Sequence, residues 1–342
     1  MPAPFPSSTD SFTDAFHTRL KALLQLPAGE DALGLLILVL ANASMMPEMA
    51  AALGPAIRKR YRELQAAGAS ALESAPADDA AVFRQLQAFD LEQIPLVRER
   101  ETGPWRLQFN PLRALRPARN SSAVIDRLYR PFDAQGFHFD KPFLEREMLW
   151  RGSVGGRDLR LLFNKFPFAH YHCLALIDAA AHKPQHLARR DVSDLLHVMD
   201  ALQRLEGLAF AWNSLGAFAS VNHQHWQMTL SDRAYPVEAP RWRHRGGDSL
   251  YPLTVQRMHS EEALWRAIDA CQRQDQAFNL LLRPGDYCLI RRRRQGHFEA
   301  QGWAPGLAWS EVCGSFGLSD EALFNGLEAE AITQQLRALA TD

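Results

Sequence analysis

Apolar residues recur at spacings of three and four over the first quarter of the chain, which is the pattern of amphipathic helices. They include Phe16, Leu20, Leu23, Leu24 and the run Ile57–Leu64. The most apolar stretch is Ala32–Ala41, which Pro47 soon follows. At roughly ten residues it is shorter than the ~20 that a bilayer-spanning helix needs. The pattern therefore predicts a buried helix there and no membrane span.

After Pro104 the pattern changes to short β-type runs bounded by proline and asparagine. The runs are Trp105–Pro111, Leu159–Pro167, His172–Ile177, Phe210–Leu230 and Phe278–Arg294, the last interpreted as two strands around a Pro-Gly-Asp turn. Two later segments have helical periodicity, Asp191–Leu208 and Asp320–Ala340. Because strands and helices do not alternate regularly, the pattern favours an α+β fold over a doubly wound sheet.

Charge and cysteine content narrow the class of protein. The 342 residues carry 38 basic and 39 acidic side chains, for a net charge of −1. A polyanion-binding protein normally shows a basic excess, so nucleic acid is not an expected partner. The four cysteines form no Cys-x-x-Cys pair, and the first residues lack the pattern of a secretory signal. Both observations favour a reduced, cytoplasmic setting.

The segment Val221–Leu230 carries the most informative side chains. In it His223, His225 and Gln227 alternate with other residues, so that a strand would place these three on one face. Three hydrogen-bonding side chains in a row are unusual for a sheet that only packs. A neutral imidazole on such a face can act as a nucleophile when an acceptor holds its other nitrogen.

Two other interpretations of these histidines remain open. His-x-His on a strand is also a zinc-binding arrangement, and His170 and His172 offer a second such pair. No carboxylate or thiolate stands at ligand spacing beside either pair, so zinc binding is the less favoured interpretation. We therefore expect no cofactor. The histidines could also simply be buried and hydrogen-bonded.

The order His223-Gln-His225-Trp-Gln227 resembles the His-x-His-x-Gln form of the histidine triad motif, in the galactose-1-phosphate uridylyltransferase branch of that superfamily. The longer stretch Asn213–Gln227 resembles the GDP-L-galactose and GDP-D-glucose phosphorylases. Other segments similar to this family are Gln108–Pro117, Arg130–Lys141, Asn164–Leu176 and Ala304–Gly314. The helical N-terminal part has no counterpart in the family.

The resemblance implies a histidine-triad-like α+β fold of two half-domains with antiparallel sheet. We expect a helical N-terminal extension over residues 1–100. A first half with the His-x-His-x-Gln motif covers residues 101–235, and a second half covers residues 236–342.

The resemblance also implies nucleotidyl transfer through a nucleotidyl-histidine intermediate. His225 is the expected nucleophile, with its Nδ1–H held by the carbonyl group of His223. Gln227 is expected to donate to a non-bridging phosphate oxygen. Glutamine at this position accompanies transferases and phosphorylases, whereas histidine accompanies hydrolases. His223, His225 and Gln227 are therefore the expected catalytic residues.

A second group of residues is expected to bind the nucleotide. Asn164 is placed by the ribose, and Lys165 is either a ligand or a surface charge. Phosphate contacts are expected from Asn213, Ser214, Ser220, Arg113 and Arg116, because neutral donors and arginine forks suit phosphate oxygens. Arg291–Arg294 is either a second anion site or a solvated strand edge. For His172 a structural role is favoured.

The leading substrates are a GDP-hexose and inorganic phosphate. Two alternatives remain: a dinucleoside polyphosphate (Ap4A-type) phosphorylase, and a non-catalytic nucleotide-binding protein. The intact triad motif disfavours the second alternative, because a binding module does not need a nucleophile. Dimers are frequent in the family, so a homodimer is the assembly that the resemblance suggests.

Overall fold

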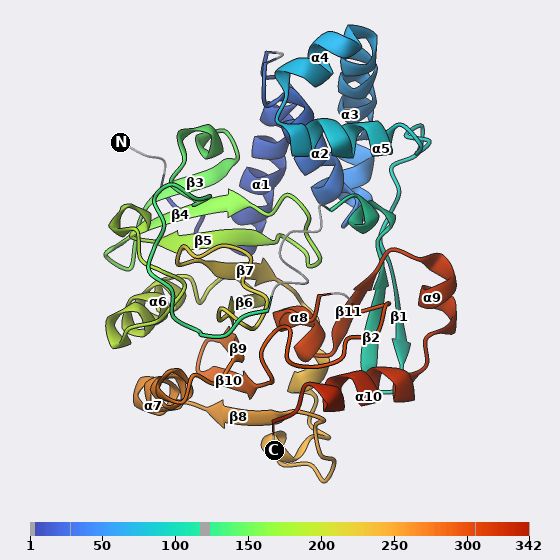
Figure 1. Cartoon of the computed structure of the whole chain (residues 1–342). Helices are drawn as coiled ribbons and strands as arrows, with labels where there is room; N and C mark the ends of the chain where they lie inside the picture. Colours follow the sequence, from blue (N-terminus) through green and yellow to red (C-terminus); the bar gives the residue numbers. More distant parts are fainter. Residues whose placement is uncertain (1–3, 28, 117–123, 305, 342) are drawn as a thin grey trace.

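The computed structural model describes residues 4–27, 29–116, 124–304 and 306–341. Its N-terminal part is helical and forms a layer at one end of the molecule, drawn in blue to teal in Figure 1. These helices are α1 (Thr9–Leu23), α2 (Ala32–Ala43), α3 (Pro47–Ala67), α4 (Ala69–Ser74) and α5 (Ala77–Leu86). The later helices are α6 (Arg189–Ala201), α7 (Glu261–Arg273), α8 (Trp309–Val312), α9 (Glu321–Gly326) and α10 (Ala329–Ala338).

Among the described residues, eight strands form one large sheet in the order β3-β4-β5-β7-β6-β9-β10-β8. They are β3 (Met148–Val154), β4 (Arg157–Phe163), β5 (Cys173–Ile177), β6 (Leu208–Asn213), β7 (Trp226–Leu230), β8 (Thr254–Met258), β9 (Phe278–Arg283) and β10 (Asp286–Arg291). All neighbouring pairs are antiparallel. Because β6 pairs with β9, strands from both predicted halves belong to this one sheet.

A smaller sheet consists of β1 (Arg98–Thr102), β2 (Trp105–Phe109) and β11 (Ser315–Leu318). Here β11 runs parallel to β2, whereas β1 runs antiparallel to it. The chain thus contributes strands to the small sheet both before and after it builds the large one. The predicted α+β class with antiparallel sheet is confirmed, with the parallel pair of β2 and β11 added.

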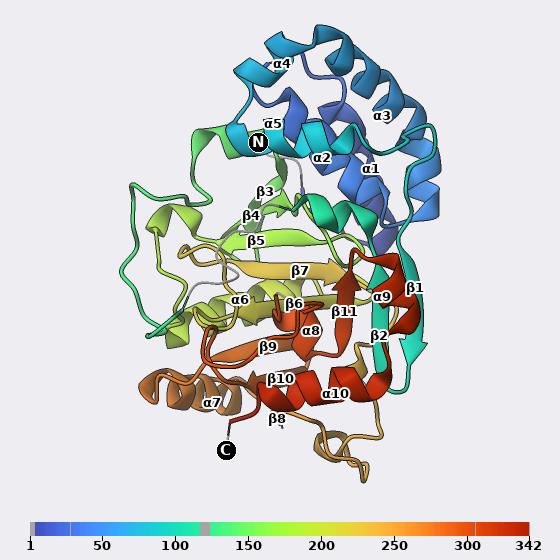
Figure 2. The same cartoon turned by 45° about the vertical axis from the view of Figure 1, so that its right-hand side comes forward.

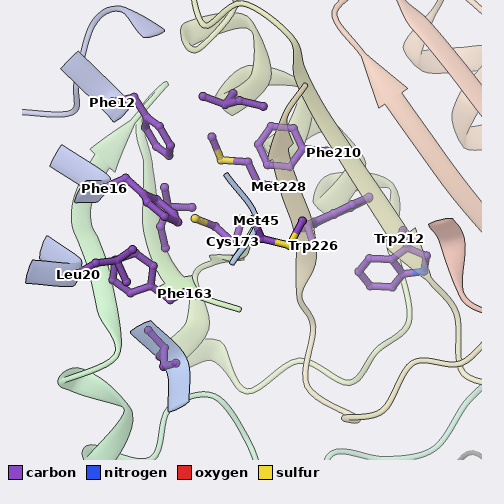
Figure 3. Packing of buried hydrophobic residues seen from close by; sticks show 14 of the residues in the cluster. Phe12, Phe16, Leu20, Met45, Phe163, Cys173, Phe210, Trp212, Trp226 and Met228 are labelled. Carbon is purple, nitrogen blue, oxygen red and sulfur yellow. The ribbon is translucent and has the colours of Figure 1, made fainter. Parts of the chain in front are cut away.

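The two faces of the large sheet have different covers (Figures 1 and 2). On one face, α1, α6 and α7 pack on apolar strand residues, and Figure 3 shows Phe12 and Phe16 of α1 facing the side of the sheet that carries Trp226 and Met228. The other face packs against β2, β11, α8 and α10 in a second apolar cluster. The sheet is therefore a central layer whose second face is available for a polar site where its apolar cover ends.

The helical layer is fastened to the sheet at several points. The ring of Phe16 meets those of Phe163 and Tyr171 edge-on at centroid distances of 4.8 and 5.2 Å. Every residue of α2 is buried, as its uniformly apolar sequence predicts. No helix in the described ranges is both long and apolar enough to pass through a membrane.

The predicted strand over Phe210–Leu230 is wrong in its middle. β6 ends at Asn213 and β7 begins at Trp226, and a loop joins them. Gly216 and Phe218 adopt positive φ angles of 78° and 67°, which a strand cannot contain. Small and polar side chains that bond to nearby backbone favour such a loop.

Two predicted helices are shorter than expected. The first ends with α6 at Ala201, where Leu202 leaves the helical conformation at φ −101° and ψ 4°. Turns then lead to Gly207, at a φ of 72°, and into β6. The predicted C-terminal helix is divided into α9 and α10. Asp320 caps the first of these through a 2.8 Å bond from the backbone N–H of Leu323.

Leu38 lies in the middle of α2 and is fully buried. We expect Leu38→Ala to lower the free energy of unfolding by about 2–5 kcal/mol, because the truncation loses buried apolar contact and leaves a cavity. Urea denaturation measures this change. Leu250, which is 67% exposed, provides the matched control, and Leu250→Ala should change stability by less than about 0.5 kcal/mol. Equal effects of the two substitutions would contradict the buried position of α2.

Candidate active site

The polar side chains of the site share one face of the large sheet. In β7, Trp226 and Met228 enter the apolar core on the first face (Figure 3), so Gln227 between them points to the second face. Its partners across the ladder are Leu174 in β5 and Ala211 in β6. His225 stands two residues before Gln227, immediately ahead of the strand. The alternation predicted from the sequence therefore begins just before β7 and continues into it.

His225 is held as a neutral imidazole with one nitrogen available. Its Nδ1–H donates to the carbonyl oxygen of His223 at 2.8 Å. Among the described residues, no group hydrogen-bonds to its Nε2. Burial lowers the pKa of His225 to about 4, so the ring is uncharged at neutral pH and Nε2 carries a lone pair. The arrangement is that of a nucleophile with its tautomer set by a backbone acceptor.

Gln185 fixes the backbone on which this geometry depends. Its Oε1 accepts the backbone N–H of His225 at 3.0 Å. Its Nε2 donates to the carbonyl oxygens of His225 and Asn213, at 3.2 and 3.0 Å. One buried amide thereby joins the chain just before β7 to the end of β6. No sequence signal distinguished this residue from other polar loop residues.

The ring of His223 is committed to backbone groups. Its Nδ1 accepts from the N–H of Phe139 at 3.1 Å, and its Nε2 donates to the carbonyl of Ala179 at 3.0 Å. Burial lowers its pKa to about 4, so it is neutral with a single ring N–H. His223 was grouped with the catalytic residues from the sequence. In the structure only its carbonyl group reaches His225, because both ring nitrogens are already bonded.

Gln227 contacts His172, the residue immediately before the neighbouring strand β5. Its Oε1 lies 2.6 Å from Nε2 of His172, a ring that is fully buried. Asn164 joins the same group, with Nδ2 at 3.2 Å from that Nε2. His172, for which sequence analysis favoured a structural role, therefore stands between two of the predicted site residues.

Lys165 points to a different partner. Its Nζ lies 2.5 Å from Oδ1 of Asp79 in α5, so its charge is paired with the helical layer. Asn164 is also tied to that layer, because its carbonyl accepts from Nδ2 of Asn42 at 3.0 Å. The structure thus brings Asn164 to the site and directs Lys165 to the N-terminal helices.

The three predicted phosphate ligands at the end of β6 and in the loop after it differ in position. Asn213 is buried, and its Oδ1 accepts from Nδ2 of Asn279 at 2.7 Å and from the N–H of Trp309 at 2.9 Å. The hydroxyl of Ser214 exchanges hydrogen bonds with the backbone of Phe278 at 2.9 and 3.1 Å, which commits it to β9. Ser220 is exposed on the loop.

The two predicted arginines lie on the His172 side of the site. The positive charges of Arg113 and Arg116 both lower the pKa of His172, after burial as the main cause. Arg113 also pairs with the buried carboxylate of Glu311 at 3.2 Å and lies 5.3 Å over the ring of Phe168. Arg116 is exposed. The chain after them, residues 117–123, lies outside the described part.

Phe139 is a wall residue that the sequence did not single out. Its ring centroid lies 4.9 Å from that of His225. It belongs to Arg130–Lys141, one of the segments that resembles the phosphorylases, and this was the only available signal. The aromatic wall limits water around the imidazole and supports its neutral state.

The run Arg291–Arg294 does not form one anion site. Arg292 is fully buried between the rings of Phe218 and Phe298, at 5.1 and 5.3 Å, and burial lowers its pKa to about 9. Arg294 instead forms a 2.9 Å ion pair with Asp275. Arg292 and Arg294 therefore have different surroundings, one between two aromatic rings and the other beside a carboxylate. The solvated-edge interpretation is also wrong for Arg292.

Within the ranges that the structure describes, no group of three or more His, Cys, Asp or Glu side chains is placed to hold a metal ion. The predicted zinc alternative required His172 as a ligand, but its Nε2 contacts Gln227 and Asn164.

Comparison with known families shows a match over part of the chain. Residues 102–229 match the family model described as GDPGP1-like, N-terminal domain. The resemblance to the GDP-hexose phosphorylase branch is confirmed over this segment. The match includes Asn164, His172, His225 and Gln227. No curated protein matches the chain by sequence.

Solved structures show the same fold. The yeast Ap4A phosphorylase Apa2 in complex with AMP superposes with a TM-score of 0.50 at 17% identity, covering 72% of this chain and 89% of that chain. The same protein without a named ligand and in complex with Ap4A gives TM-scores of 0.48 and 0.49, at 14% and 16% identity, each covering 72% of this chain and 90% of that chain. The superposition on the AMP complex, at a TM-score of 0.50, confirms the predicted histidine-triad-like fold.

The buried histidines predict how stability depends on pH. His172, His223 and His225 have pKa values of about 4 in the folded chain, against 6.5 for an ordinary histidine. Between these values the unfolded chain binds more protons, so the free energy of unfolding decreases as the pH falls from 6.5 toward 4. We expect the Tm, measured by calorimetry, to decline over this window.

Replacing one titrating ring provides the control for this prediction. His225→Gln should reduce the slope of Tm against pH between pH 6.5 and pH 4, because one buried group no longer titrates. Leu250→Ala removes an exposed side chain that does not titrate and should leave the slope unchanged. A Tm that rises as the pH falls through this window would contradict the burial of the three rings.

Proposed function

We propose that the chain is a nucleotidyltransferase that works as a phosphorylase, with a nucleoside diphosphate sugar and inorganic phosphate as substrates. The observation that carries the proposal is the state of His225. It is neutral, its Nδ1–H is held by the His223 carbonyl at 2.8 Å, and its Nε2 shares a sheet face with Gln227. A binding protein does not need a buried imidazole with its lone pair set in this way.

In the first step, the Nε2 lone pair of His225 attacks the α-phosphorus of the substrate. A phosphorus–nitrogen bond forms while the bond from that phosphorus to the bridging oxygen breaks. The electron pair of the broken bond leaves with the sugar 1-phosphate. The modified ring keeps its proton on Nδ1 and becomes positively charged, and the carbonyl dipole of His223 stabilises that charge.

In the second step, an oxygen of inorganic phosphate attacks the same phosphorus. The phosphorus–nitrogen bond breaks, its electron pair returns to Nε2, and the nucleoside diphosphate is released. Gln227 donates to a non-bridging oxygen in both steps. Because its amide is neutral, it cannot act as a general acid or base for water, and transfer to phosphate is favoured over hydrolysis.

GDP-hexose is the substrate that we place first. The segment that contains the motif is GDPGP1-like, and Asn164, Arg113 and Arg116 lie on the Gln227 side of the site, where a nucleotide's ribose and phosphates can reach them. Ap4A is the second candidate, because the fold is shared with an Ap4A phosphorylase. Both substrates present an α-phosphorus to the same nucleophile and differ in the base and in the leaving group.

Intact-protein mass spectrometry tests the proposal. The protein is mixed without phosphate with GDP-D-glucose, GDP-L-galactose, UDP-glucose or Ap4A. We expect an added mass of one nucleoside monophosphate with the true substrate, and loss of this adduct when phosphate is added. The mass of the adduct identifies the base.

Two variants complete this experiment. His225→Ala should abolish the adduct and lower turnover by at least about 10⁴-fold, because no other group supplies the nucleophile. His197→Ala, an exposed histidine on α6, is the matched control and should form the adduct normally. Absence of adduct and of phosphate-dependent turnover with all four substrates would show that the proposed function is wrong.

A further inference from the structure

The amide of Gln227 is oriented by one short contact. Its Oε1 lies 2.6 Å from Nε2 of His172, and both side chains are buried. In the described residues, no acceptor is bonded to the amide nitrogen of Gln227. The position of the proton on His172 therefore decides which end of the Gln227 amide faces the substrate.

The contacts of His172 place its proton on Nε2. Burial first, and then the charges of Arg113 and Arg116, lower its pKa to about 4, so the ring carries one N–H at neutral pH. A lone pair on Nε2 would repel the oxygen of Gln227 at 2.6 Å. With the proton on Nε2, this contact is a hydrogen bond from His172 to Gln227. Asn164 Nδ2, at 3.2 Å, is then a neighbour of the ring and not its donor.

The ring has little freedom to leave this orientation. Phe168 packs edge-on against it at a centroid distance of 4.4 Å, and Trp309 lies at 6.3 Å. The carbonyl of His172 accepts the backbone N–H of Asn164 at 3.0 Å. The turn at Asn164 is in turn bonded to Asn42 of α2. Packing and backbone pairing together hold the imidazole against Gln227.

Space filling alone does not explain a histidine at this position. Nδ1 of His172 is buried and has no hydrogen-bond partner in the described part of the chain. An unpaired buried acceptor costs stability, whereas an apolar side chain would fill the same space without that cost. The polar ring at this position lowers stability relative to an apolar side chain, which indicates a function for its Nε2–H.

We propose that His172 is a positioning residue for nucleotidyl transfer, whose Nε2–H holds the Gln227 amide with its NH₂ group toward a non-bridging oxygen of the α-phosphoryl group. The inference rests on the proposed function. With the amide reversed, the carbonyl oxygen of Gln227 would face the phosphoryl oxygens, where negative charge increases during the reaction. His172 itself does not touch the substrate.

Two substitutions separate the hydrogen bond from the packing. His172→Leu removes the donor, and His172→Gln keeps an N–H donor at a similar reach. The rate of adduct formation is measured in a single turnover with GDP-D-glucose, or with the substrate that labels the wild type. We expect a loss of about 10- to 100-fold in His172→Leu, because Gln227 is no longer aligned. We expect a substantial part of the rate to return in His172→Gln.

A double-mutant cycle shows whether His172 acts through Gln227. Gln227→Ala alone should slow adduct formation, and adding His172→Leu to it should have little further effect, because the group that His172 orients is already absent. If the two losses multiply, His172 supports the site in another way and the inference is overturned. Wild-type rates in His172→Leu would also overturn it.

A measurement on the unmodified side chain covers the case in which His172→Leu does not fold. Nitrogen-15 NMR of the wild-type protein, with the His172 signals assigned by comparison with His172→Gln, should show a neutral ring protonated on Nε2 at pH 7. Protonation on Nδ1 would overturn the inference. If the wild type forms no adduct with any substrate, the proposed function fails and the inference fails with it. If it forms an adduct that His172→Leu does not slow, only the inference fails.

Discussion

The hydrogen bond from Nδ1–H of His225 to the carbonyl of His223 is the constraint on which the site depends. It assigns the ring proton to Nδ1 and leaves Nε2 with a lone pair. Because donor and acceptor are only two residues apart, their distance is set by the backbone between them. That backbone is held by Gln185 and by the two bonds of the His223 ring. Residues far apart in the chain therefore together determine which nitrogen of His225 carries the proton.

Burial gives this arrangement its electrostatic character. His172, His223 and His225 all have pKa values of about 4, so three imidazoles stand close to the site without positive charge. Each has one N–H, and each N–H has a different acceptor. In a poorly solvated interior these hydrogen bonds are stronger than in water, but a polar group without a hydrogen-bond partner lowers stability more. The site thus consists of neutral donors and acceptors, and the charges of Arg113 and Arg116 lie on its His172 side.

The helical layer takes part in this construction, although the resemblance to the phosphorylases offered no counterpart for it. Its apolar helix α2 is buried, so the layer shares the core of the protein. Asn42 bonds the Asn164 turn, and Asp79 neutralises Lys165 beside it. The turn between β4 and β5 is consequently fastened from outside the sheet. That turn leads directly to His172 at the edge of the site.

The sequence alone determined the helical and strand-rich parts, the buried helix at Ala32–Ala41 and the shared face of His225 and Gln227. These follow from local periodicity, which side chains impose on their own backbone. Tertiary structure decided that the His223 ring bonds to backbone groups and that Arg292 is buried. It also decided that Ser214 bonds to the backbone of β9 and that Lys165 pairs with Asp79 of α5. Each of these outcomes depends on a partner distant in the chain. Whether a polar group is hydrogen-bonded or a charge is paired depends on such distant partners, and no local sequence pattern specifies them.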